Sequence, residues 1–301
     1  MSFISIIIPT LNRPEDLLKA VNSLCTQTRL PDELIIVDQS HDKLSIIPVK
    51  KIMRKYFAIK LVYIHDSKIA GLVEAKQRGV LNAEGDLICF LEDDVILEKK
   101  YLNQIELGFT KNLNMIGCSG IITNPPKNNF LYKTFFKIFH LGIYKDKRVC
   151  LSENFFGYQN KLIPSKMLSG GVSAWRQNVF EIIPFDIKNG FHMYEDIDFS
   201  TRVAYDFPGQ LFINPNARLA HYFSPINRDL SGVRERRKIT ECCIYYKKRK
   251  NWQGSTFPFF WLLFGMFLQS FYQSLKSKSF SPIYGYFLGI RDGYKKKYIR
   301  S

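Results

Sequence analysis

Residues 87–97 read LICFLEDDVIL. Five apolar residues are followed by three consecutive acids, Glu92, Asp93 and Asp94, and then by three more apolar residues. A continuous apolar run of this length predicts a strand covered on both faces, as in a parallel sheet. Such strands present ligand-binding residues at their carboxyl ends. Adjacent carboxylates repel one another unless a cation or a donor-rich ligand lies between them, so the stretch predicts a ligand site. The alternative is a solvated acidic turn that binds nothing.

Strand and helix patterns alternate through the first 120 residues. Strands are expected at 3–8, 33–38, 60–64, 87–91 and 115–122, and helices at 12–25, 46–57, 72–83 and 99–113. Asn12 is expected to cap the first helix, because Pro14 stands in its first turn. The order predicts a doubly wound α/β fold with a mostly parallel sheet.

Polar residues follow three of these strands, where the carboxyl ends should meet at one edge. They are Thr10, Asn12, Asp38, Ser40, Asp93 and Asp94. Nucleotides bind at such an edge in α/β sheets. Neither Gly-rich phosphate-loop motif follows any expected strand. The phosphates of a bound nucleotide would therefore need another partner, and a divalent metal on the acids is the natural one.

The pattern breaks at residues 124–164, which begin with a Pro-rich turn and include the aromatic segment 130–144. We interpret it as an insertion over the active edge, either a lid or an interfacial helix, or alternatively an ordinary packed helix. Residues 166–175 then predict a loop and a strand, whose paired glycines allow a tight turn or a close approach to a ligand. A helix over 194–205, a strand at 211–214 and the segment 217–222 close the domain.

The C-terminal residues carry most of the positive charge. Residues 231–301 hold 15 Lys and Arg against three acids, which is +12 of the total of +16. The uncharged run 257–268 is too short for a span of about 20 residues. In the second apolar segment, 283–290, and just beyond it, glycines recur every four residues, which favours close helix packing. We expect two short helices on an anionic inner leaflet, or alternatively two helices packed against the preceding domain.

The cysteines, the first residues and the basic residues indicate which compartment and which partners to expect. The six cysteines show no metal-binding spacing, and residues 1–8 lack the basic region of a secretory signal. Reduced, mostly buried thiols in a cytosolic protein are therefore expected. A nucleic-acid partner is not expected, because the basic residues lie beside apolar runs and no recognition motif appears.

The chain resembles family 2 glycosyltransferases of the GT-A fold, in particular bacterial polysaccharide or rhamnosyltransferase-like members. Five stretches within residues 3–224 carry the resemblance in the expected order, namely 4–13, 34–40, 71–79, 85–94 and 194–198. Three of these motifs depart from the family pattern. Glu92 and Gln39 stand where Asp is common, and Lys76-Gln77 stands where Arg-Asn is common.

The resemblance implies a role for each matching residue. Those expected to bind the nucleotide are Pro9, Thr10, Asn12, Arg13, Lys76, Asp38 at the base edge and Asp93 at the ribose. Asp94 should coordinate Mg²⁺ or Mn²⁺, with a further metal or diphosphate contact from His221. Those expected near the donor sugar and acceptor are Ser169, Gly170, Gly171 and Trp175. Asp196, beside Glu195, should be the catalytic base. Alternatively these two acids only complement the dipole of their helix.

The implied activity is inverting transfer of a sugar from a nucleoside-diphosphate sugar to a glycan or polyprenyl-linked acceptor. The catalytic domain is expected over 1–230, with halves near 1–123 and 165–230 around the insertion, and the helical tail over 231–301. The protein would lie at the cytoplasmic face of the plasma membrane as a peripheral or monotopic protein. Two alternatives remain, a nucleotidyltransferase, which usually has a Gly-rich loop after its first strand, and a catalytically inactive scaffold.

Overall fold

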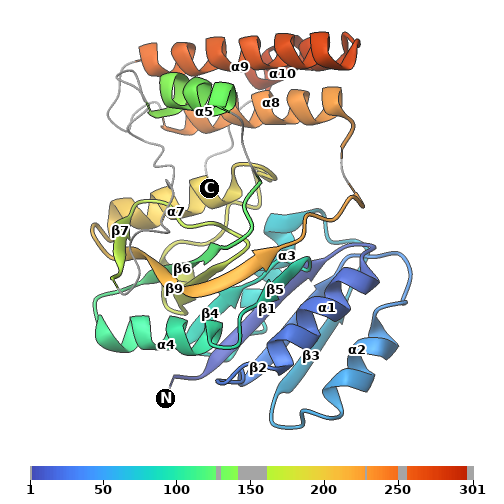
Figure 1. The fold of residues 1–301 in the computed structure, drawn as a ribbon, viewed down its shortest axis with the longest axis vertical. Helices are drawn as coiled ribbons and strands as arrows, with labels where there is room; N and C mark the ends of the chain where they lie inside the picture. The colour runs from blue at the N-terminus through green and yellow to red at the C-terminus, as the bar shows by residue number, and fades with distance from the viewer. Residues whose placement is uncertain (1, 127–129, 142–160, 228, 250–255, 297–301) are drawn as a thin grey trace. The chain divides into compact units, whose positions relative to one another are not determined.

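The computed structural model describes residues 2–126, 130–141, 161–227, 229–249 and 256–296 (Figure 1). The chain forms two compact units, which are described separately. The first consists of Met1–Pro125, Ser152–Gly190 and Phe199–Asn227. The second consists of Pro126–Leu151, Phe191–Asp198 and Arg228–Ser301. The domain boundary expected at residue 230 stays a prediction.

Four parallel strands form one half of the sheet in the first unit. They lie in the order β3-β2-β1-β4, with bounds β1 (Ile4–Thr10), β2 (Glu33–Asp38), β3 (Lys60–His65) and β4 (Leu87–Phe90). Ile6 and Ile8 of β1 enter one hydrophobic cluster, while Ile7 enters the cluster on the other face. This strand is thus covered on both sides, which explains why its sequence shows no alternation.

The other half of the sheet is mixed, so the expectation of a mostly parallel sheet is wrong there. Its strands are β5 (Val95–Leu97), β6 (Gly117–Ile122), β7 (Ile163–Ser165), β8 (Ser173–Arg176) and β9 (Leu211–His221). Strand β8 runs antiparallel between β4 and β6, and β5 and β7 run antiparallel to β9. The strand expected at 211–214 continues through the following segment as far as His221. The register between β6 and β9 shifts opposite Gly120, so that residues 214–217 of β9 have no paired partner in β6.

Helices cover both faces of this sheet. Their bounds are α1 (Pro14–Cys25), α2 (Ile46–Met53), α3 (Leu72–Val80), α4 (Tyr101–Lys111) and the short α6 (Val179–Ile182). Helices α1 and α4 enter the same cluster as Ile6, and α3 enters the cluster of Ile7. Helix α3 ends three residues before the expected end, because Asn82 and Ala83 already donate backbone bonds three residues back.

The first helix begins differently from the expected capped start. Arg13 occupies the capping position without a side-chain hydrogen bond to the helix. Asn12 instead has a φ of +53°, and its N–H donates to Ser40 Oγ at 2.7 Å. Asn12 therefore ties the first strand end to the second, and its expected capping role is wrong.

The second unit is helical. It contains α5 (Phe130–Phe136), the π-helical turn η1 (Lys137–Leu141), α8 (Ser231–Arg249), α9 (Phe257–Ser277) and α10 (Ser281–Lys295). Helix α7 (Glu195–Asp206) starts in this unit and ends in the first. The helical character expected for residues 231–301 is confirmed in α8, α9 and α10.

Glycines of α10 allow it to lie directly on α8, as the four-residue spacing predicts (Figure 1). A Cβ at Gly285 would collide with the Gly232 carbonyl, and one at Gly293 would meet the Cys243 side chain. None of the helices that the structure describes is both long and apolar enough to cross a membrane. Five cysteines are buried free thiols, as expected, and Cys150 lies outside the described residues.

Candidate active site

The ends of β1 and β4 meet through direct hydrogen bonds. Thr10 Oγ1 donates to Asp93 Oδ2 at 2.7 Å, and Arg13 Nη1 donates to Asp93 Oδ1 at 3.0 Å. Burial raises the pKa of Asp93 to about 6, although Arg13 and Thr10 lower it. The expected gathering of polar residues at one sheet edge is therefore confirmed for this group. Pro9 lies within β1, directly before Thr10.

Asp38 at the end of β2 is fully buried and held by its own neighbours. Tyr63 Oη donates to Asp38 Oδ2 at 2.7 Å, and the N–H of Ser40 donates to Asp38 Oδ1 at 3.0 Å. Burial, followed by the bond to Asp38, raises the pKa of Tyr63 well above its ordinary value. Tyr63 is not among the predicted site residues, because only strand pairing places it beside this carboxylate.

Glu92, Asp94 and His221 converge on one point. His221 Nε2 lies 2.8 Å from Glu92 Oε2 and 2.9 Å from Asp94 Oδ1, and the three candidate ligand atoms lie within 4.8 Å of one another. Nε2 is buried, yet neither contact has the angles of a hydrogen bond. Two carboxylate oxygens and one imidazole nitrogen that meet in this way can hold a divalent cation. Glu92, a departure from the family pattern, thus joins the two expected ligands.

The register of two strands creates this cluster. Val95 of β5 pairs with His221 of β9, so the histidine lies directly beside the acids that precede β5. Asn124 fixes the backbone on both sides of the histidine, since its Oδ1 accepts from the His221 N–H at 2.7 Å and its Nδ2 donates to the His221 carbonyl at 3.0 Å. Asn124 also was not among the predicted site residues.

The charges within the cluster stabilise one another. Burial lowers the pKa of His221, but contacts with Asp94 and Glu92 outweigh it and raise the pKa to about 9. For Asp94, burial raises the pKa, but His221, the Ser224 N–H at 2.9 Å and Arg13 together bring it below its ordinary value. Two carboxylates and one imidazole thus meet at one point, an arrangement that a divalent cation can also stabilise.

The chain after β9 returns over the first strand end. The N–H of Tyr222 donates to the Asp94 carbonyl at 2.8 Å. Arg13 Nη2 donates to the Ile226 carbonyl at 2.8 Å, and Asn227 donates to the Leu11 carbonyl. Arg13 thus joins this return segment to Asp93, a contact between residues more than 200 positions apart.

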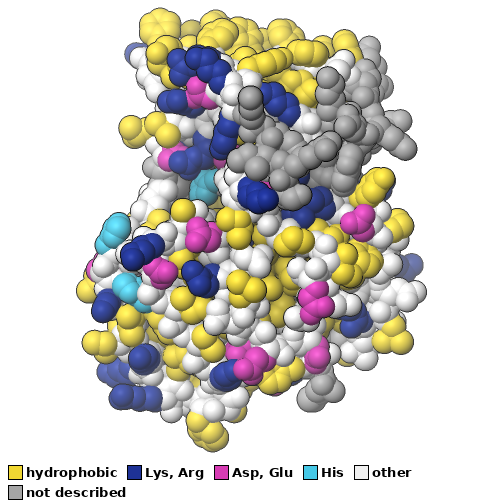
Figure 2. Space-filling view, turned by 180° about the vertical axis from the view of Figure 1, so that it is seen from behind, with side chains coloured by type: hydrophobic (Ala, Val, Ile, Leu, Met, Phe, Trp, Pro, Cys, Tyr) yellow, Lys and Arg dark blue, Asp and Glu magenta, His cyan; other side chains and the backbone are white. Residues whose placement is uncertain are grey.

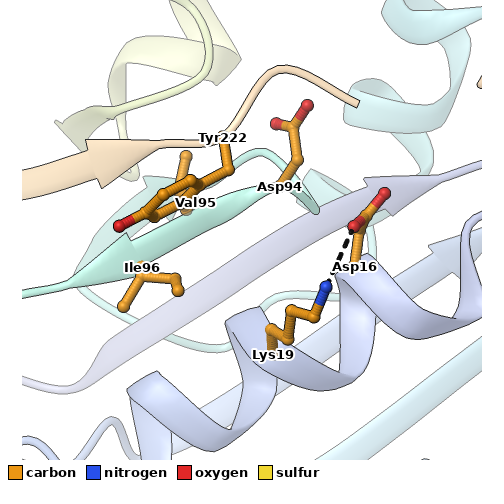
Figure 3. Close-up of a pocket in the computed structure, with 6 residues that line it drawn as sticks. All are labelled: Asp16, Lys19, Asp94, Val95, Ile96 and Tyr222. Carbon is orange, nitrogen blue, oxygen red and sulfur yellow. Dashed lines mark ion pairs between the residues drawn. The ribbon is translucent and has the colours of Figure 1, made fainter. Parts of the chain in front are cut away.

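A half-open pocket of about 240 Å³ adjoins the cluster (Figure 3). Asp16 and Lys19 approach it from α1, and their side chains form an ion pair at 3.8 Å. The other lining residues are Asp94, Val95, Ile96 and Tyr222. The pocket therefore shares one side chain, Asp94, with the candidate cation site.

The loop with paired glycines lies against the acids. The N–H of Glu92 donates to the Gly171 carbonyl at 3.0 Å, and a Cβ at Gly171 would collide with the Glu92 side chain. Lys76 Nζ donates to the Gly170 carbonyl at 2.9 Å, and this lysine is 2% exposed. The glycines thus permit a close approach to a site residue. Ser169 begins this turn by accepting a bond from the Val172 N–H at 3.3 Å.

Trp175 belongs to the hydrophobic core. Its side chain is 2% exposed, its Nε1 donates to Ser173 Oγ at 2.9 Å, and its ring lies 4.9 Å from that of Phe199. Its expected place near the donor sugar and acceptor stays a prediction. Its strand, β8, lies between β4 and β6, where both faces are covered by helices.

Glu195 and Asp196 open helix α7 within the second unit. Asp196 is half-buried, and its Oδ1 accepts from the Ile197 N–H at 2.8 Å. Glu195 is buried. Their expected catalytic roles stay predictions.

Comparisons with known proteins agree with this geometry. The family model described as "Glycosyl transferase family 2" matches residues 5–182, more than half of the chain. The chain belongs to glycosyl transferase family 2. The match spans β1 to α6 and includes all of the first-unit site residues except His221 and the return segment that follows it.

Two relatives illustrate the range of this similarity. "Uncharacterized glycosyltransferase YwdF" of Bacillus subtilis (strain 168) is 29% identical over 205 residues, covering 68% of this chain and 69% of that protein. "Inactive polypeptide N-acetylgalactosaminyltransferase-like protein 5" of Macaca fascicularis is 25% identical over 210 residues, covering 67% of this chain and 46% of that protein. This chain thus spans less than half of the second relative.

Solved structures of glycosyltransferases share the fold. Mannosyltransferase PcManGT from Pyrobaculum calidifontis, in complex with GDP-Man and Mn²⁺, superposes with a TM-score of 0.59 at 12% identity, covering 99% of this chain and 76% of that one. S. aureus TarS 1-349 superposes with a TM-score of 0.53 at 15% identity, covering 99% and 93%. At such identity the likeness shows the GT-A fold alone. Family and fold together support a transferase of glycosyl groups.

Proposed function

We propose that this protein transfers a sugar, with inversion, from a nucleoside-diphosphate sugar to an acceptor hydroxyl. The convergence of Glu92, Asp94 and His221 next to Asp93 is the observation that carries the proposal. The three converging side chains suit a cation, and Asp93 suits a ribose. Both lie at the strand ends where α/β folds bind nucleotides. The solved mannosyltransferase with GDP-Man and Mn²⁺ supports a nucleotide-sugar donor.

Mg²⁺ or Mn²⁺ fits the candidate cation site. Hard carboxylate oxygens from Glu92 and Asp94 suit either ion, and His221 Nε2 lacks a well-angled hydrogen bond among the described residues. When bound, the ion neutralises the charge that develops on the leaving diphosphate. Arg13, whose Nη1 lies 3.8 Å from Asp94 Oδ2, adds a fixed positive charge at the same edge.

Asp196 is proposed as the general base, with Glu195 beside it. A neutral sugar hydroxyl is a poor nucleophile, so a carboxylate must take its proton as the new bond forms. A positioned base typically contributes about 10²–10⁴-fold to the rate. Inversion then follows from a single displacement at the anomeric carbon.

The test is a measurement of nucleoside-diphosphate release from UDP-, dTDP- and GDP-sugars, with Mn²⁺ and a membrane lipid extract as the acceptor source. We expect release from one donor, and its loss when a chelator removes the metal. Release of pyrophosphate instead would identify a nucleotidyltransferase. No release from any donor, together with no metal-dependent nucleotide binding, would identify the protein as an inactive scaffold. One relative is likewise named as inactive.

The second unit offers a surface suited to an anionic membrane. Large apolar side chains at three- and four-residue spacing form one exposed face of α9, and a similar row lies on α10. These residues, which we call the aromatic face, are Phe257, Phe260, Phe264, Phe271, Leu275, Phe280, Tyr284, Phe287 and Tyr294. Figure 2 shows hydrophobic side chains gathered over this end of the unit. The rings of Phe267 and Phe287, 6.1 Å apart, join the two helices into one surface.

Basic residues surround the aromatic face. Lys276 is in the last turn of α9 and Lys278 follows that helix, while Arg291 and Lys295 lie near the end of α10, and all four are exposed. Aromatic side chains flanked by Lys and Arg are typical of helices that lie in a membrane interface. A site at the cytoplasmic face of the plasma membrane would give access to a polyprenyl-linked or cell-envelope glycan.

Membrane docking can be tested by flotation with vesicles that contain phosphatidylglycerol. We expect the wild type to float, and the triple variant Phe260→Ser, Phe264→Ser and Phe271→Ser to lose at least about 10-fold in affinity, because each side chain contributes roughly 1.5–3 kcal/mol when fully buried. The matched control replaces three exposed apolar residues of the first unit, Leu44, Ile47 and Phe57, by Ser. Equal flotation of both variants would contradict the proposal. A concentration-dependent dimer that the triple variant abolishes would assign the face to a second copy.

A further inference from the structure

Helix α8 inserts a buried carboxylate beneath the start of α7. A single oxygen of Glu241, Oε2, accepts the backbone N–H groups of His192, Met193 and Tyr194 at 3.0, 2.7 and 3.1 Å. These three residues directly precede Glu195. Charge-assisted hydrogen bonds are about twice as strong as neutral ones, so this carboxylate fixes the backbone that leads into the acidic pair.

The same helix holds the other side of the acidic pair. Lys248 Nζ lies 2.9 Å from Asp198 Oδ1, with side chains 5% and 2% exposed, and 5.5 Å from the centre of the Phe191 ring. The N–H of Asp198 in turn donates to the Tyr194 carbonyl at 2.8 Å. Glu241 and Lys248 are seven residues apart and therefore project from one face of α8. Together they fix the segment 191–198 on both sides of Asp196.

We infer that Glu241 and Lys248 are positioning residues for Asp196, and that α8 is thereby part of the catalytic machinery. The inference rests on the proposed function, which assigns Asp196 as the general base. A base acts only within hydrogen-bond reach of the proton it takes, and a displacement of about 1 Å can cost about 10²-fold in rate. The segment before α7 has irregular backbone, so partners outside it, here Glu241 and Lys248 of α8, are needed to hold Asp196 in a fixed position.

A merely structural role for Glu241 makes a different prediction. The carboxylate also satisfies N–H groups at the helix start, so its loss could lower stability without any link to Asp196. In that case activity would fall by the same factor whether or not Asp196 is present. The two roles are therefore separable by a double-mutant cycle, because residues that act as one unit are not additive.

The experiment compares Glu241→Ala and Glu241→Gln, each alone and together with Asp196→Asn, in the full chain. We expect Glu241→Ala to lower kcat about 100-fold, with KM for the donor within about twofold. Glu241→Gln, which keeps an oxygen for the N–H groups, should recover part of the loss. In the Asp196→Asn background neither change should lower the residual rate further. Glu235→Gln is the matched control, because Glu235 is equally buried on α8 but bonds Ser270 and Lys238.

Two outcomes would overturn the inference. One is an equal loss in both backgrounds, and the other is a wild-type kcat in Glu241→Ala. Hydrogen exchange adds a measurement that does not need activity. The amides of residues 192–194 should exchange faster in Glu241→Ala than in the wild type, and at the wild-type rate in Glu235→Gln. Failure of the wild type to transfer from any donor is a distinct result, which overturns the proposed function and with it this inference.

Discussion

Asp94→Asn should abolish metal-dependent nucleotide binding. The substitution keeps the size of the side chain but removes one of two negative charges that converge with His221 Nε2. Changes outside the ligand shell already cost about 10–100-fold in metal affinity, so loss of a direct carboxylate ligand should cost at least about 100-fold. Calorimetric titration of the nucleoside diphosphate in the presence and absence of Mn²⁺ measures the effect.

The control for this prediction is Asp16→Asn. Asp16 lines the same pocket but pairs with Lys19 and stands apart from the three candidate ligands. We expect Mn²⁺-dependent binding to survive in this variant. Retained metal dependence in Asp94→Asn would remove the candidate cation site from the proposed function and leave nucleotide binding to Asp93, Thr10 and Arg13.

Asp196→Asn is expected to retain donor binding and to lose transfer by about 10²–10⁴-fold, the usual contribution of a positioned base. The amide oxygen of Asn can still accept the Ile197 N–H that Asp196 Oδ1 accepts, so the helix start should persist. The residues proposed to bind the nucleotide belong to the first unit and Asp196 to the second. Turnover and the dissociation constant of the donor, measured on the same preparation, separate the two effects.

Asp206→Asn provides the matched control for the base. Asp206 is exposed at the other end of the same helix, α7, and carries the same charge. Its replacement should leave kcat within about twofold. A wild-type kcat in Asp196→Asn would reassign Glu195 and Asp196 to the electrostatic role of acids in a first helical turn, worth roughly 0.3–1 kcal/mol each.

Local patterns in the chain predicted the parts of the site that depend on single elements. The apolar runs of β1, β2 and β4 identified strands buried on both faces, and the polar residues after them identified the sheet edge. The spacing of Gly285, Gly289 and Gly293 predicted a close helix contact, which α8 provides. These features succeed because burial and side-chain direction repeat with the period of the element itself.

The errors concern partners that lie far apart in sequence. The expectation of a mostly parallel sheet fails in one half, because β8 inserts antiparallel between β4 and β6 and so buries Trp175. Asn12 was assigned to a helix cap, but the adjacent strand end offers Ser40 Oγ as a better partner for its backbone. The residues near each position in the sequence do not show which distant residues will lie beside it.

The sequence by itself determined the parallel half of the sheet, the acidic edge and membership in the resembled family, because these depend on periodicity and on short motifs. Only the tertiary structure decided that Glu92 joins Asp94 and His221 while Asp93 binds Thr10 and Arg13. That division follows from the register of β5 against β9, where Val95 pairs with His221. Register between strands so distant is set by packing of the whole sheet, since a shift of one residue would turn every side chain to the opposite face.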